Sequence, residues 1–146
     1  MAMCQEPSNS TSYTEELMLE YSGLIIGQTV TGVGLTGKTA RIHLNNGSVQ
    51  LYAEWNLTDN HGNILDHSED FTVRKTFRLW CLIGRSVVNF SLTGDLFTQL
   101  AIAFESDYFI TAQGDGDAFE DWQVVINTRD NVPNRFLVCM GTAQQV

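Results

Sequence analysis

The 146-residue sequence is short of basic side chains. Eight Lys and Arg stand against 17 Asp and Glu, which gives a formal net charge of −9 at pH 7. No Lys or Arg occurs between Arg85 and Arg129. A charge of this sign opposes binding to nucleic-acid phosphate and to anionic lipid. We therefore expect no nucleic-acid or membrane partner, and a basic partner or a cation agrees better with the composition.

Cysteines and long apolar runs are also scarce. Cys4, Cys81 and Cys139 form no C-x-x-C pair and have no histidine at zinc-finger spacing, which predicts reduced thiols. No segment approaches the roughly 20 apolar residues of a membrane span. Residues 1–12 lack the basic and apolar regions of a secretory signal. Together these absences predict a cytoplasmic protein, and the length of 146 residues predicts a single domain.

The sequence does contain an internal repeat. Residues 25–37, IIGQTVTGVGLTG, align with residues 82–94, LIGRSVVNFSLTG, at a shift of 57 positions, and six of the thirteen positions are identical. Each copy ends on an acidic residue and a tryptophan, in AEW at 53–55 and in FEDW at 119–122. We interpret this pattern as a duplication.

Apolar and polar residues alternate inside each copy, which is typical of strands. Residues 40–44 and 49–55 alternate on either side of an NNG turn, and residues 100–104 alternate in the second copy. A capping box predicts a helix before the first copy, and an N-cap serine followed by apolar residues at helical spacing predicts another after residue 68. Alternation after residue 70 would also suit a strand.

These elements predict an α+β fold, in which two helix-plus-three-strand pseudo-repeats form a mostly antiparallel sheet with both helices on one face. The predicted single domain, 1–146, divides into disordered residues 1–11, pseudo-repeat one at 12–57, a loop at 58–67, pseudo-repeat two at 68–126 and a C-terminal strand at 135–140.

The octapeptide GVGLTGKT, residues 32–39, matches the P-loop pattern G-x-x-x-x-G-K-[ST]. A P-loop requires a buried strand before the glycine turn and a helix after it. Here the following residues alternate into a hairpin, and the second copy has Asp95 where Lys38 stands. We interpret the match as a surface turn and predict no nucleotide cofactor.

No other pattern predicts catalysis or a metal site. Asp59, His61, Asp66 and His67 lie in a polar stretch without a third histidine, so we interpret it as a solvated loop. The sequence has no G-x-S-x-G, and its apolar cysteines have no neighbouring histidine. We therefore assign no catalytic, cofactor-binding or metal-binding residues.

An insertion in the second copy, QGDGDAFED at 113–121, contains a run of acids. Insertions into repeats fall in loops and often carry a specific role. The candidate partner-binding residues are Glu105, Asp107, Asp115, Asp117, Glu120 and Asp121. A solvated acidic face is an alternative interpretation, and so is cation binding, although the spacing differs from an EF-hand loop.

The half-unit IG-x-x-V, a hydrophobic hairpin and E-x-W or E-D-W resembles small, mostly uncharacterised bacterial domains over residues 17–126. Some proteins of similar size and acidity are immunity proteins that neutralise toxins, and the resemblance implies no catalytic residues. The leading hypothesis is a non-enzymatic, immunity-like protein whose acidic surface binds a basic protein. The alternative is a small-molecule binder or enzyme with a pocket between the halves, and a homodimer is a further option.

Overall fold

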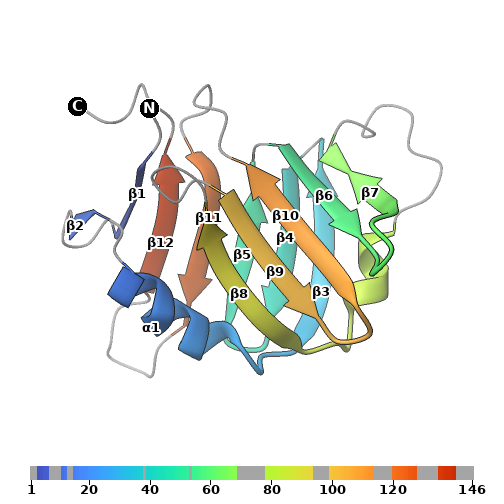
Figure 1. Ribbon diagram of the computed structural model, residues 1–146, viewed down its shortest axis with the longest axis horizontal. Helices are drawn as coiled ribbons and strands as arrows, with labels where there is room; N and C mark the ends of the chain where they lie inside the picture. Colours follow the sequence, from blue (N-terminus) through green and yellow to red (C-terminus); the bar gives the residue numbers. More distant parts are fainter. Residues whose placement is uncertain are drawn as a thin grey trace.

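The computed structural model describes residues 3–6, 11–12, 15–37, 39–52, 54–68, 78–93, 99–113, 120–127 and 135–140. Over these residues the chain forms two antiparallel sheets, packed face to face, and one α-helix, α1, at Glu15–Ile25 (Figure 1). A 3₁₀-helix, η2, spans Leu79–Leu82. In the described part of the chain, no helix is long and apolar enough to cross a bilayer.

The seven-stranded sheet has the order β2-β1-β12-β11-β5-β4-β3. Its strands are β1 (Met3–Glu6), β2 (Thr11–Ser12), β3 (Val30–Thr36), β4 (Thr39–Leu44), β5 (Gly47–Leu51), β11 (Glu120–Ile126) and β12 (Arg135–Met140). The five-stranded sheet has the order β7-β6-β10-β9-β8. Its strands are β6 (Glu54–Thr58), β7 (Ile64–His67), β8 (Val87–Thr93), β9 (Gln99–Phe104) and β10 (Tyr108–Gln113).

The predicted α+β fold is wrong. Strands account for 62% of the described residues and helical residues for 15%, against about 20–25% strand in an average soluble protein. Over the part of the chain that the structure describes, two sheets are present instead of one, and one α-helix instead of two. Alternation showed that each strand buries one face, but it does not reveal what covers that face. Here the second sheet covers it, as in a sandwich.

The second predicted helix falls mostly on residues 69–77, which lie outside the described residues. The described end of this segment forms η2, with Leu79 and Leu82 buried and Trp80 exposed. The segment predicted as the loop 58–67 includes β7, which pairs with β6. Met3–Glu6, in the segment predicted to be disordered, forms β1 and pairs with β12.

The two copies of the repeat exchange their fourth strands. The first copy contributes β3, β4 and β5 to one sheet and the second contributes β8, β9 and β10 to the other. The strand that follows then joins the opposite sheet, because β6 pairs with β10 and β11 pairs with β5 (Figure 1). Each sheet therefore combines three strands of one copy with the fourth strand of the other.

Equivalent hydrogen bonds join the copies at the start of β3 and β8. Gly27 N donates to Val87 O at 2.8 Å, and Gly84 N donates to Val30 O at 2.8 Å. The centre of this junction is the bridge between Thr29 and Ser86, which are 57 residues apart. Both glycines have positive φ, 92° and 87°. The backbone of the junction is thus the same when the two copies are interchanged.

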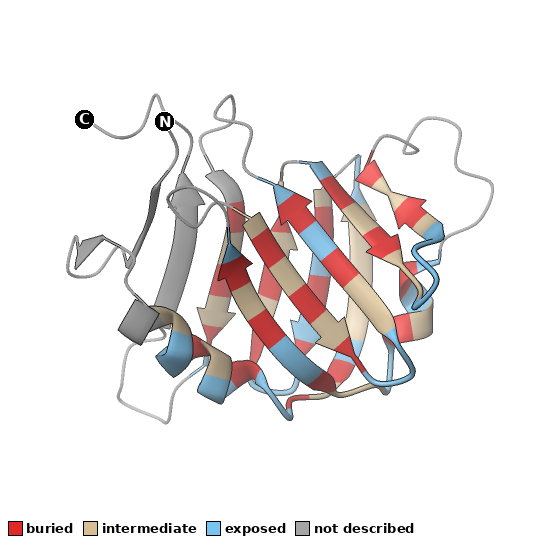
Figure 2. Cartoon of the chain, in the orientation of Figure 1, coloured by how far each residue is buried: buried red, intermediate tan, exposed pale blue. Residues whose placement is uncertain are grey.

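The core lies between the sheets. Trp55 on β6 and Trp122 on β11, the tryptophans that end the two copies, are both 0% exposed. Buried and partly exposed residues alternate along β8, β9 and β10 (Figure 2). Helix α1 packs beside β8, where Leu92 N donates to Met18 Sδ at 3.4 Å. These three strands of the five-stranded sheet therefore have one inward and one outward face.

Candidate binding pocket

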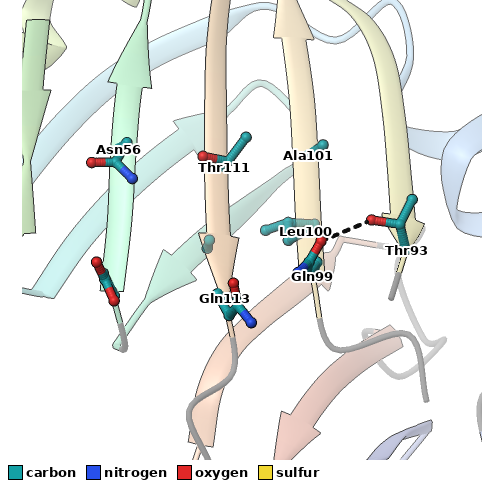
Figure 3. A pocket seen from close by; sticks show the side chains of 9 residues that line it. Asn56, Thr93, Gln99, Leu100, Ala101, Thr111 and Gln113 are labelled. Atoms are coloured by element: carbon teal, nitrogen blue, oxygen red, sulfur yellow. Dashed lines mark hydrogen bonds between the residues drawn. The ribbon is translucent and has the colours of Figure 1, made fainter. Parts of the chain in front are cut away.

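A pocket of about 310 Å³ opens on the outer face of the five-stranded sheet. Its walls come from four adjacent strands, β6, β10, β9 and β8 (Figure 3). The lining residues are Glu54, Asn56, Thr93, Gln99, Leu100, Ala101, Thr111, Ala112 and Gln113. We call this site the sheet-face pocket.

Strand register explains why polar side chains meet there. One row across the four strands consists of Glu54, Gln113, Gln99 and Thr93, each in register with the next. The next row consists of Asn56, Thr111, Ala101 and Ser91. Residues two apart on a strand point to the same face, so both rows face outward. Ala101 has the smallest side chain of the row that contains Asn56 and Thr111, and it leaves the hollow open (Figure 3).

The pocket offers hydrogen-bonding groups and one carboxylate. Glu54 is exposed and is the only ionisable residue among those that line it. Thr93 Oγ1 donates to Gln99 Oε1 at 3.3 Å (Figure 3). Asn, Gln and Thr side chains supply further acceptor oxygens. A carboxylate among neutral acceptors suits a cationic ligand with several N–H donors.

Two of the predicted acidic residues, Glu105 and Asp107, lie away from the sheet-face pocket. Glu105 and Asp107 lie in the β9–β10 turn, at the Tyr108 end of β10, whereas the pocket lies at its Gln113 end. Five residue steps along a strand separate these ends by about 17 Å. Glu105 also has a structural role, because its Oε1 accepts a hydrogen bond from Ser86 N at 2.7 Å.

The side chains of the other four predicted acids lie outside the described residues. Glu120 begins β11, although its side chain and that of Asp121 lie outside the described residues. Asp115 and Asp117, in the β10–β11 connection that follows Gln113, are also outside them. The structure therefore separates Glu105 and Asp107 from the pocket and leaves the position of the other four side chains untested.

Sequence reasoning missed Glu54, the one carboxylate of the pocket. It is the acid of the AEW signature and aligns with Asp121 in the second copy, which was selected. The sequence prediction followed the insertion, which only the second copy carries. The alignment of Glu54 with Asp121 is the signal that identifies Glu54 as an equivalent acid.

The P-loop-like octapeptide forms a β-hairpin. Residues 32–36 belong to β3, Gly37 turns with φ of 60°, and β4 begins at Thr39. Lys38 lies outside the described residues. A strand follows the glycine turn, so the converging N–H groups of a helix N-terminus, on which a P-loop depends, are missing from this hairpin.

The polar residues after β6 stabilise turns. Asp59 accepts hydrogen bonds from His61 N at 2.9 Å and from Asn63 N and Nδ2 at 3.0 Å. The bond from the Asn63 side chain is the main cause that lowers the pKa of Asp59. Asp66 is buried and accepts from Arg78 N at 3.0 Å. Over the described ranges, no group of three or more His, Cys, Asp or Glu could hold a metal ion.

Cys81 is half-buried and is a free thiol. Burial raises the pKa of this thiol, which lowers the fraction of thiolate.

The alternative hypothesis placed a pocket between the two halves. Between the sheets the described residues include fully buried side chains such as Trp55, Trp122 and Leu51. The two pockets that can be described, the sheet-face pocket and one beside β3 and β4, both lie on outer faces.

The chain matched no protein family, no curated protein and no solved structure. The resemblance to small bacterial domains, some of them immunity proteins, therefore stays a prediction. The argument for function rests on the geometry and charge of the pocket.

Proposed function

We propose that the chain is a non-enzymatic binding protein that recognises a basic protein partner through the sheet-face pocket. In this proposal an arginine or lysine side chain of the partner enters the pocket and approaches the Glu54 carboxylate. Asn56, Gln99 and Thr111 provide acceptors for the remaining N–H groups. The observation that supports this proposal most strongly is that Glu54 is the only ionisable residue among the nine described residues that line the pocket.

The charge distribution around the pocket supports the same partner. The strands β8, β9 and β10 and the connections between them contain no Lys or Arg after Arg85, whereas Asp95 and Asp115 follow the pocket residues Thr93 and Gln113 by two positions. A net charge of −9 adds a general attraction for a basic partner. Complementary charge increases association rates and selects against acidic proteins.

Arginine suits this site better than lysine. Its guanidinium is planar and carries five N–H donors, so it can contact a carboxylate and neighbouring amide oxygens together. The pocket places such acceptors in two rows on adjacent strands. An immunity role, in which the partner is a basic toxin, is a narrower version of this proposal.

The test uses ¹⁵N-labelled full-length protein titrated with a blocked tripeptide, acetyl-Gly-Arg-Gly-amide. The neutral citrulline analogue has nearly the same shape and serves as the charge control. We expect saturable amide shifts in residues 54–56, 99–101 and 111–113 with the arginine peptide, and weaker shifts with citrulline. Loss of one charge-assisted hydrogen bond in Glu54→Gln should weaken binding by roughly tenfold.

Asp107→Asn is the matched control, because it removes one exposed acid at the other end of β10 and an asparagine tolerates φ of 61°. Binding should survive this change. A second variant, Ala101→Leu, fills the hollow and should reduce binding without changing charge. Equal loss in Glu54→Gln and Asp107→Asn would show that only net charge matters, and shifts outside the pocket would refute the site.

A further inference from the structure

A second pocket, of about 290 Å³, lies on the outer face of the other sheet. Its lining residues are Gly34, Leu35, Thr36, Thr39, Arg41 and His43, which come from β3 and β4. It therefore lies against the hairpin that carries the P-loop-like octapeptide. We call it the hairpin pocket.

The hairpin pocket carries the opposite charge to the sheet-face pocket. Arg41 and His43 are both exposed on β4 and point to the outer face, because the residues between and beside them, Ile42 and Leu44, are buried. None of the described residues that line the pocket is acidic. Among the described residues, Arg41 contacts only a neutral acceptor, Gln50 Oε1, at 3.4 Å.

Glycine leaves room beside these two side chains. Gly34 is in register with Arg41, and Gly32 is in register with His43. A Cβ added at Gly34 would meet no atom within 4 Å, and one added at Gly32 would lie 3.7 Å from His43 Cδ2. On the outer face, Arg41 and His43 of β4 therefore border two positions of β3 that carry no side chain, Gly34 and Gly32, and a ligand can lie close to both residues.

We infer that the hairpin pocket binds a tetrahedral oxyanion, a phosphate or sulfate group carried by a small ligand. The Arg41 guanidinium supplies paired N–H donors that match two oxygens of such a group. His43 and the hydroxyls of Thr36 and Thr39 add donors for the others. The volume is at the low end for small-molecule sites and leaves space for a group esterified to the anion. This site binds through side chains on a hairpin, so it does not use P-loop geometry.

The inference is independent of the proposed function, because the two pockets lie on different sheets and require ligands of opposite charge. It is tested with the ¹⁵N-labelled full-length protein and three probes: inorganic phosphate, sulfate and acetate. Sodium chloride keeps the ionic strength constant, since general screening would otherwise change with each addition. We expect saturable shifts in residues 34–36 and 39–43 with phosphate and sulfate, and weaker ones with acetate.

Two variants test the site by different means. Arg41→Gln removes the guanidinium and should weaken phosphate binding by roughly tenfold. Gly34→Val fills the pocket from the opposite strand and should abolish binding, while an unchanged unfolding midpoint shows that the fold persists. Arg85→Gln removes an arginine elsewhere and should leave binding intact. Shifts that rise linearly, that are equal for acetate, or that persist in Arg41→Gln would overturn the inference.

Discussion

The outer faces of the two sheets differ in chemistry although equivalent strands build them. In the first copy Gly34, Arg41 and Gln50 form one row across β3, β4 and β5. The corresponding row of the second copy is Ser91, Ala101 and Thr111. An arginine beside a glycine gives a cationic hollow, and an alanine between hydroxyl residues gives a neutral hollow next to Glu54. The outward side chains thus differ between equivalent strands of the two copies, whereas the inward side chains pack together between the sheets.

The junction between the copies shows the reverse behaviour, because different residues make the same contacts. Gln28 Nε2 donates to Leu24 O at 2.8 Å, and Arg85 Nε donates to Cys81 O at 2.9 Å. Asn45 Oδ1 accepts from Thr29 N at 2.7 Å, as Glu105 Oε1 does from Ser86 N. The hydrogen bonds are retained at two pairs of equivalent positions whose side chains differ, Gln28 with Arg85 and Asn45 with Glu105, which indicates that the junction is structurally constrained.

The largest expected loss of stability comes from a substitution at Gly47, a position where β5 differs from the equivalent strand β10. A Cβ at Gly47 would lie 2.2 Å from Val125 O on β11, whereas Tyr108 begins β10 with a full side chain. Because backbone must move, Gly47→Ala should destabilise the protein by about 3 kcal/mol, the upper part of the range for overpacking. Urea unfolding measures this loss. Gly34→Ala, on an open face, should be nearly neutral, and equal losses in both variants would contradict the account.

Gly27 and Gly84 provide the next test, because they occupy equivalent junction positions with positive φ. No atom lies within 4 Å of an added Cβ at either position, so the cost of alanine is backbone strain alone. Each alanine variant should lose about 1–2 kcal/mol. Urea unfolding of the two single variants should give similar losses. A clear difference between them would show that the two sides of the junction are not equivalent in energy.

Asn45 and Glu105, whose side chains accept equivalent hydrogen bonds from backbone N–H groups at the junction, allow a finer comparison of the two copies. Replacing either by alanine removes one hydrogen bond to a backbone N–H and should cost about 1 kcal/mol. Glu105→Gln should retain most of the stability, because an amide oxygen accepts as Asn45 does. It should also leave binding of the arginine peptide unchanged, which distinguishes a structural acid from Glu54. Loss of peptide binding in Glu105→Gln would instead support the acidic cluster predicted from the sequence.

The smallest effect concerns Asp59, whose pKa is lowered from the ordinary value of 3.8, mainly by the hydrogen bond from the Asn63 side chain. Because the folded-state pKa is the lower one, this contribution to stability is present above the unfolded pKa and is lost as pH falls through the folded pKa. Asn63→Ala should therefore raise the pKa of Asp59 in an NMR titration. An unchanged pKa would show that the bond does not form in solution.

Local patterns predicted much of the strand content, but not the partners of the strands. The alternation at 40–44 and 100–104 and the turn at NNG depend on neighbouring residues, and β4, β5 and β9 lie there. The exchange of β6 and β11 depends on pairs such as Leu57 with Ile110, which are far apart in sequence. Such contacts leave no periodic signal, which is why a single sheet covered by helices was an equally good interpretation of the same alternation.

The candidate sites were harder to predict for the same reason. Arg41 was visible as an outward residue of an alternating segment, but only the strand register places Gly34 beside it. Glu54 lines the sheet-face pocket because β6, which follows the first copy in sequence, pairs with β10 of the second copy. The predicted acids Glu105 and Asp107 were close in sequence to the insertion, yet a strand carries them to the opposite end of the sheet.

We propose that the two sheets present binding pockets of opposite charge on opposite faces. A single labelled sample, titrated in parallel with the arginine peptide and with inorganic phosphate, tests this proposal directly. We expect two separate sets of shifted amides, residues 54–56, 99–101 and 111–113 for the peptide and residues 34–36 and 39–43 for phosphate. Shifts of the same amides by both probes, or no saturable shift by either, would contradict it.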